Sequence, residues 1–262
     1  MNLGITGRQA VVCAASSGLG FACAAALVAE GVNVTINARR PEGLYEAVRQ
    51  LESINSEVRV TSVVGDISCP EVQHAVVNVS PTVDILVTNA GGPPVGSDSD
   101  WPRESWLQAI ETNMLTPIVL IQSVLEKMRN QNFGRIVNIT SGSVKAPQNS
   151  LSLSNGARGG LTVYVSGLAK NPTLASQNVT INNLLPGAFA TPRLMQTFAD
   201  SVWRYGELTE NMAIERRNKI PAGRFGVPEE FGAYCAFLCS ANAGYITGQN
   251  ILIDGGAYQG VF

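Results

Sequence analysis

The turn Cys13-Ala-Ala-Ser-Ser-Gly-Leu-Gly20 is the most informative stretch of the sequence. It joins an apolar run at residues 10–13 to an alanine-rich segment ending near Glu30. The run is typical of a buried strand and the segment of a helix. Gly18 and Gly20 let the backbone approach a ligand, and unpaired N–H groups at a helix start attract anions. This strand–turn–helix unit therefore predicts a site for the pyrophosphate of a dinucleotide.

Strand-like and helix-like segments alternate along the rest of the chain. The predicted strands are residues 10–13, 32–37, 58–64, 84–88, 135–140, 179–185 and 251–253, and the main helices after the first are 41–54, 69–79, 106–130, 153–169 and 229–239. Strands separated by helices imply crossover connections and a parallel sheet covered on both faces. We predict one α/β domain over residues 1–262, a Rossmann-type doubly wound sheet of about seven parallel strands. Residues 191–226 interrupt the alternation and are expected to form a lid over a ligand cleft.

Composition narrows the functional classes. With 18 basic and 20 acidic side chains the net charge is −2, which argues against a nucleic-acid partner. The longest apolar stretch, residues 21–29, is too short for a membrane span, and the first residues lack signal-peptide features, so a cytoplasmic location is expected. Charged residues make up only 15%, which fits either a buried parallel sheet or a large subunit interface.

The five cysteines are scattered and include no Cys-x-x-Cys pair. His74 is the only histidine and has no partner nearby in the sequence. Cys235 and Cys239 are four residues apart, so a helix would place them on one face. Buried free thiols are expected, and no metal site is predicted.

Several motifs, in the same order along the chain, resemble the short-chain dehydrogenase/reductase (SDR) family, close to its 3-oxoacyl-acyl-carrier-protein reductases. They are Cys13-Ala14-x-x-x-Gly18-x-Gly20, Asp66-Ile67, Asn89-Ala90-Gly91, Asn113, Gly134 to Ser141, Asn182, Pro186-Gly187 with Thr191, Thr247-Gly248-Gln249 and Asp254-Gly255-Gly256. The resemblance implies a carbonyl/alcohol oxidoreductase that binds a nicotinamide dinucleotide. It also implies a homotetramer, with a homodimer as the next choice, because the family's long fifth and sixth helices usually pair across subunits. The cofactor-binding residues it implies are Ser16, Ser17, Gly18, Leu19, Gly20, Asp66, Ile67, Asn89, Ala90, Gly91, Pro186, Gly187 and Thr191.

The end of the second strand indicates which cofactor is bound. An NAD site needs a carboxylate there for the ribose 2′-hydroxyl, but Ala38 stands at that position and Arg39 follows it. A guanidinium can pair with a 2′-phosphate in bidentate fashion. NADP(H) is therefore predicted, with Arg39 as a cofactor-binding residue.

The catalytic part of the family pattern is incomplete. SDR enzymes use a tyrosine to donate a proton and a lysine four residues later. An alignment anchored on Gly160-Leu161-Thr162 puts Leu151 and Asn155 at these positions. The loop between Ser141 and Leu151 is then about three residues shorter than the family usually has.

Other residues near these two positions are candidates for the catalytic roles. The resemblance implies that Ser141 polarises the carbonyl, with Ser143 as a substitute, and that Asn113 holds a water. Lys145 follows Ser141 by four residues, and a partly desolvated lysine there could donate the proton. Asn155 can still bond a ribose hydroxyl.

The leading prediction is an NADP(H)-dependent carbonyl/alcohol oxidoreductase acting on a small molecule. Two alternatives stay open because the tyrosine and lysine are absent from the expected positions. One is a nucleotide-binding protein with little or no redox turnover. The other is a lyase or isomerase step in the same cleft.

Overall fold

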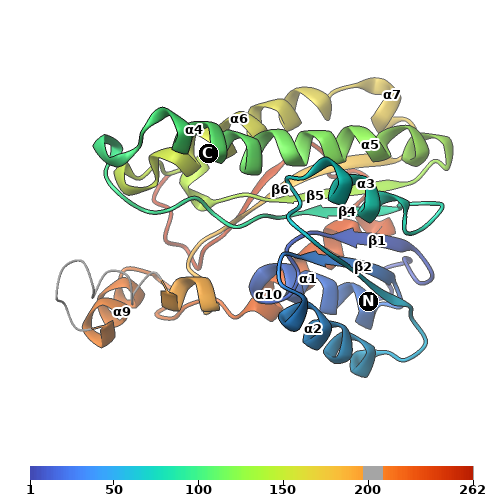
Figure 1. The fold of residues 1–262 in the computed structure, drawn as a ribbon, viewed down its shortest axis with the longest axis horizontal. Helices are drawn as coiled ribbons and strands as arrows, with labels where there is room; N and C mark the ends of the chain where they lie inside the picture. The colour runs from blue at the N-terminus through green and yellow to red at the C-terminus, as the bar shows by residue number, and fades with distance from the viewer. Residues whose placement is uncertain (197–208, 262) are drawn as a thin grey trace.

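Seven parallel strands form one sheet in the computed structural model, which describes residues 1–196 and 209–261 (Figure 1). Their order is β3-β2-β1-β4-β5-β6-β7, so the chain winds outward from the centre in both directions. The predicted doubly wound sheet is confirmed. The strands are β1 (Gln9–Val12), β2 (Asn33–Ala38), β3 (Val60–Val64), β4 (Ile85–Thr88), β5 (Gly134–Ile139), β6 (Val179–Pro186) and β7 (Asn250–Ile253).

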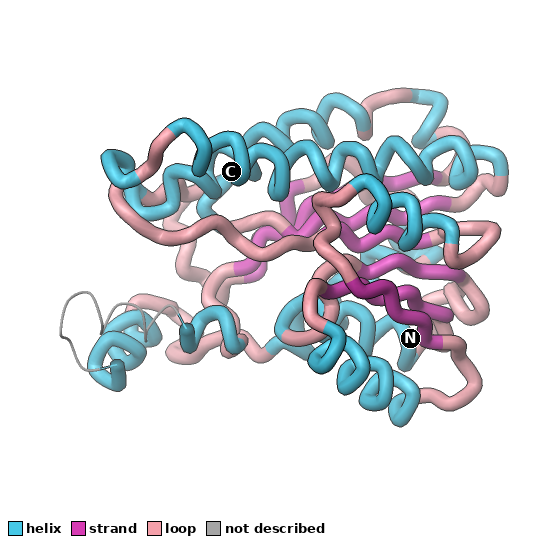
Figure 2. Tube along the Cα trace, viewed as in Figure 1, coloured by secondary structure: helices cyan, strands magenta, loops and turns pink. Residues whose placement is uncertain are grey.

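Helices cover both faces of this sheet (Figure 2). One layer holds α1 (Gly18–Ala29), α2 (Pro41–Ile54) and α10 (Pro228–Cys239). The other holds α3 (Pro70–Asn78), α5 (Thr116–Asn130) and α6 (Ser152–Leu168), with α4 (Arg103–Ile110) packed on α6. Two further helices are α7 (Pro172–Ala175) and α9 (Thr209–Asn218).

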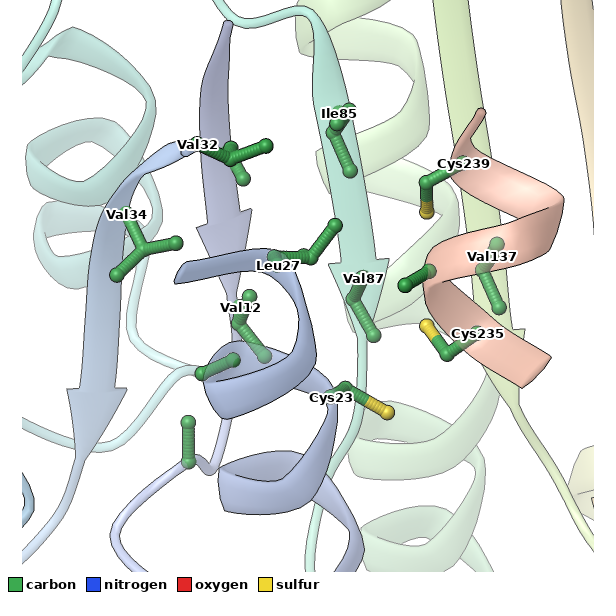
Figure 3. Packing of buried hydrophobic residues seen from close by; sticks show 14 of the residues in the cluster. Val12, Cys23, Leu27, Val32, Val34, Ile85, Val87, Val137, Cys235 and Cys239 are labelled. Carbon is green, nitrogen blue, oxygen red and sulfur yellow. The ribbon is translucent and has the colours of Figure 1, made fainter. Parts of the chain in front are cut away.

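Burial on both faces explains why the central strands are apolar without alternation. Val11 and Val12 are both buried, yet Val11 belongs to the core under α3, α5 and α6, and Val12 to the core under α1 and α10. Figure 3 shows the second of these cores, where Cys23 of α1 lies beside Cys235 of α10. The predicted buried free thiols are confirmed at these two positions and at Cys13 and Cys239. The prediction is wrong for Cys69, which is exposed because it lies in the connection that leads into α3 and not inside the core.

Helices α1 and α10 approach each other unusually closely. A Cβ atom at Gly232 would lie 2.3 Å from the Ala22 carbonyl oxygen, so only glycine permits this contact. The contact packs α10 directly against the first turns of α1.

The predicted helix over residues 106–130 is not continuous. Helix α4 ends at Ile110, a π-helical turn follows over Glu111–Leu115, and α5 begins at Thr116. Pro117 has no N–H group to donate to the carbonyl four residues earlier, that of Asn113, so the regular ladder is broken there. Wider turns of this kind often mark functional sites in helices.

From β1 the chain continues to β2 and β3 on one side of the sheet, and from β4 it continues to β5, β6 and β7 on the other side. The strand order therefore reverses between β1 and β4. In a doubly wound sheet the ligand cleft lies at the carboxyl ends of the strands at this switch point. Of the predicted lid, residues 197–208 lie outside the described residues, and α9 belongs to the part that follows. No helix in the described ranges is long and apolar enough to cross a lipid bilayer.

Candidate active site

The turn between β1 and α1 brings the start of α1 against the end of β4. A Cβ atom at Gly20 would lie 2.4 Å from the Ala14 carbonyl oxygen and 2.9 Å from Asn89 Nδ2. The Asn89 amide donates to that same carbonyl at 3.3 Å. Only glycine fits under this turn. Its packing aims the N-terminus of α1, at Ser17 and Gly18, into the cleft, where it can bind an anion.

One end of the cleft is a cavity of about 720 Å³ at the carboxyl ends of β1, β2 and β3. Arg39 and Asp66 lie in its wall together with Ala38. The Ser68 backbone N–H, 3.0 Å from Asp66 Oδ1, lowers the pKa of that carboxyl, and the Ser68 hydroxyl and the Arg39 charge act in the same direction. Asp66 is therefore anionic at neutral pH and can accept a hydrogen bond. Predicted cofactor residues in this wall are Ser16, Ser17, Arg39, Asp66, Ile67, Ala90 and Gly91.

The cleft continues as a second cavity of about 610 Å³ that shares Ser17, Arg39 and Gly91 with the first. Four arginines lie in its wall, and no aspartate or glutamate lies among the described lining residues. Such a wall attracts an anionic ligand. Further predicted cofactor residues that line it are Gly18, Leu19, Asn89, Pro186, Gly187 and Thr191.

Ser141 ends the strand region of β5 and faces this second cavity. Its hydroxyl oxygen is 2.9 Å from the Ser143 hydroxyl and accepts the Ser143 backbone N–H at 3.1 Å. These two contacts orient the Ser141 side chain. A third cavity, of about 600 Å³, begins at Ser141 and Ser143 and extends toward β7 and the end of α9.

Asn113 lies in the π-helical turn and is 5% exposed. Its side-chain oxygen Oδ1 is buried and has no hydrogen-bond partner among the described residues. It borders a small polar cavity of about 10 Å³, shared with Thr88, Thr112 and Arg158. A space of roughly this size holds a single water. The expected water-holding role of Asn113 is compatible with this geometry and stays a prediction.

Arg158 of α6 also lines the second cavity. Its Nη1 donates to the carbonyl oxygens of Ile139 and Thr140, at 2.8 and 2.7 Å. Burial, and secondarily the charge of Arg193, lowers the pKa of Arg158 to about 10, so the side chain is still cationic at neutral pH. Ser154, one helical turn earlier, lines the same cavity.

Two predicted site residues lie elsewhere. Lys145 is half-buried, and its backbone N–H donates to the Gly142 carbonyl. The Asn155 side-chain amide donates to the Gln148 carbonyl at 2.8 Å. Neither residue is among those lining the four cavities described above. Their roles as proton donor and ribose ligand remain predictions.

Known proteins resemble this chain in sequence over nearly its whole length. A family profile described as enoyl-(acyl carrier protein) reductase matches residues 13–258. The chain belongs to the short-chain dehydrogenase/reductase family. Dehydrogenase/reductase SDR family member 4 of Oryctolagus cuniculus is 30% identical over 260 residues, 97% of this chain and 94% of the relative. The 3-oxoacyl-(acyl-carrier-protein) reductase FabG of Vibrio cholerae is 30% identical over 263 residues, 98% and 100% of the two chains.

Solved SDR structures share the whole architecture. The L-sorbose reductase of Gluconobacter frateurii, complexed with NADPH and L-sorbose, superposes with a TM-score of 0.92 at 28% identity and covers 100% of both chains. The predicted family and fold are therefore confirmed.

Sequence reasoning missed Ser154 and Arg158 in this SDR chain. Two signals were available in Ser154-Asn-Gly-Ala-Arg158-Gly-Gly-Leu: a charged residue among small and apolar ones, and a hydroxyl four residues before it. The alignment anchored on residues 160–162 assigns the two family positions to Leu151 and Asn155, three residues earlier in the chain than this pair.

Proposed function

We propose that this SDR chain is an NADPH-dependent reductase of a small carbonyl compound. The observation that carries the proposal is the cleft of two cavities that share Arg39 and Ser17 at the N-terminus of α1, with Ser141 in the wall of the second cavity. Its combined volume and its cationic wall suit a dinucleotide with an extra phosphate. The relative crystallised with NADPH and a sugar supports the same cofactor.

The residues present fit that cofactor. The space kept open by Gly20 and the start of α1 would receive the pyrophosphate. Arg39 would pair with the 2′-phosphate, since Ala38 offers no carboxylate to repel it. Asn89, Gly187 and Thr191 would hold the nicotinamide half. When bound, NADPH supplies a hydride for the substrate carbonyl.

The reaction site is built around Ser141. Its hydroxyl, oriented by Ser143, donates a hydrogen bond to the carbonyl oxygen and polarises the carbonyl carbon. Asn113 would keep a water in the small cavity behind the cleft, where it can exchange protons with solvent. Lys145, or another group at the cleft, must compensate for the missing tyrosine and lysine.

Two measurements test the proposal together. Fluorescence titration should show NADPH binding, and loss of NADPH absorbance should occur with members of a ketone, aldehyde and oxo-ester panel. Tight NADPH binding without oxidation on the whole panel would contradict a reductase and favour a binding protein. Substrate conversion without added cofactor would favour lyase or isomerase chemistry.

A further inference from the structure

Arg158 is a buried cation that has no counter-ion among the residues that the structure describes. Its residue surface is 7% exposed, and it takes part in none of the ion pairs formed by the described residues. Burying an unpaired charge is costly, and proteins usually pair such groups or avoid them. An arginine retained in this state at the wall of a cleft points to a ligand or a reaction that uses its charge.

The hydrogen bonds of Arg158 fix its position at the reaction site. The Ile139 and Thr140 carbonyls, which accept from Nη1, immediately precede Ser141 in the chain. A guanidinium has five N–H donors, so donors remain after these two bonds. Nε and Nη2 donate to no atom of residues 1–196 or 209–261. Arg158 therefore presents unused donors to a cleft that it shares with Ser141.

Ser154 completes the arrangement. It precedes Arg158 by four residues on α6, a spacing that places both side chains on one face of the helix. Ser154 is 7% exposed and lines the same cavity as Arg158 and Ser141. Its hydroxyl makes no hydrogen bond to the described part of the chain. A hydroxyl and a fixed cation thus line the same cavity near the carboxyl end of β5.

We infer that Ser154 and Arg158, not Leu151 and Asn155, form the hydroxyl–cation pair of the reaction site. The inference rests on the proposed reductase function. The pair keeps the four-residue spacing of the family's tyrosine and lysine, and it lies three residues later than the first alignment. That shift also removes the three-residue deficit in the loop after Ser141. Leu151 still lines the cleft but has no polar group, and Asn155 bonds Gln148 instead.

The pair would act on the substrate oxygen. As the hydride adds to the carbonyl carbon, the C=O π electrons move to oxygen. Ser141 and Ser154 donate hydrogen bonds to that oxygen, and the Arg158 charge stabilises the negative charge that develops there. The Ser154 hydroxyl supplies the proton that completes the alcohol and recovers it from water in the cleft. The net reaction consumes one carbonyl, one NADPH and one proton, and yields one alcohol and one NADP⁺.

Arg158→Gln and Ser154→Ala test this inference. Each should lower kcat for NADPH oxidation by about 10²- to 10³-fold, the range seen when one oxyanion donor is removed. Arg158→Lys should recover part of the loss because it restores a cation. Lys170→Met, which removes an exposed cation just after the same helix, is the matched control and should keep wild-type turnover. Thermal melts would verify that each variant folds.

A binding readout separates this role from mere structural support. The nicotinamide ring of NADP⁺ is cationic and that of NADPH is neutral, so Arg158 disfavours NADP⁺ in the cleft. Arg158→Gln should lower the ratio of the NADP⁺ to the NADPH dissociation constant by about threefold or more. Lys170→Met should leave that ratio unchanged.

The outcomes distinguish this inference from the proposed function. Wild-type turnover in Arg158→Gln and Ser154→Ala, with turnover lost in Lys145→Met, would overturn the inference and assign the role to Lys145. If the wild-type protein oxidises NADPH with none of the carbonyl compounds in the panel, the proposed function fails. In that case the ratio of the NADP⁺ to the NADPH dissociation constant still tests the inference. A lower ratio in Arg158→Gln supports the placement of this cation beside the nicotinamide, and an unchanged ratio overturns it.

Discussion

Replacing Arg39 should change which cofactor the protein prefers. Arg39 is exposed, lines both cavities of the cleft and follows Ala38 at the end of β2. NADPH differs from NADH at this end only by the 2′-phosphate. We therefore expect the wild-type protein to bind NADPH at least about tenfold more tightly than NADH, a difference of about 1.4 kcal/mol.

The size of the effect follows from the exposure of Arg39. Hydrogen bonds to charged groups contribute about 1.5–3 kcal/mol, and exposed ion pairs only about 0.2–1 kcal/mol. A guanidinium that is partly screened by solvent falls between these ranges. Arg39→Ala should raise the NADPH dissociation constant about tenfold and change that for NADH by less than about twofold. Adding Ala38→Asp should then favour NADH, because a carboxylate can accept from the 2′-hydroxyl and repels the 2′-phosphate.

Fluorescence titration with NADPH and with NADH directly measures the four dissociation constants of the wild type and Arg39→Ala. Arg40→Ala is the matched control, because Arg40 is the neighbouring exposed arginine and lies outside the lining of both cavities. Salt offers a second check, since the Debye length falls from about 10 Å at 0.1 M to about 3 Å at 1 M. NADPH binding to the wild type should weaken with salt more than binding to Arg39→Ala. An unchanged NADPH/NADH ratio in Arg39→Ala, or the same change in Arg40→Ala, would refute the reasoning.

Three further predictions concern assembly, the turn and the thiols. Light scattering should give a tetramer of four 27.7 kDa chains, and Val163→Glu, at a residue 74% exposed on α6, should reduce that mass; a monomeric wild type would contradict this. Gly20→Ala should abolish NADPH binding because its Cβ would meet the Ala14 carbonyl at 2.4 Å, whereas Gly18→Ala should cost only about 1–2 kcal/mol of stability for its positive φ, as thermal unfolding would show. A thiol reagent should label only the exposed Cys69 in the native chain and all five cysteines after unfolding.

The residue pattern was sufficient for the fold. Apolar strand segments, the glycine turn at residues 13–20 and the helical segments between strands predicted a doubly wound parallel sheet, which the structure and the SDR relatives confirm. These features are local in the chain: periodicity and glycine placement act within a few residues. The π-helical turn at Asn113 also has a local cause, Pro117, although the apolar periodicity of residues 106–130 is typical of one continuous helix.

Other features depended on the tertiary structure. The sequence shows Lys145 and Arg158 as two cations near Ser141, and proximity along the chain favoured Lys145. The packing of α6 against the end of β5 buries Arg158 in the cleft, where its guanidinium bonds two strand carbonyls, while Lys145 stays outside the lining. Helical rotation advances about 100° per residue, so a shift of three residues in register changes which side chains face the cleft. Composition and motifs therefore determined the fold and the place of the cofactor cleft, and only the packing of α6 decided which hydroxyl and which cation line it.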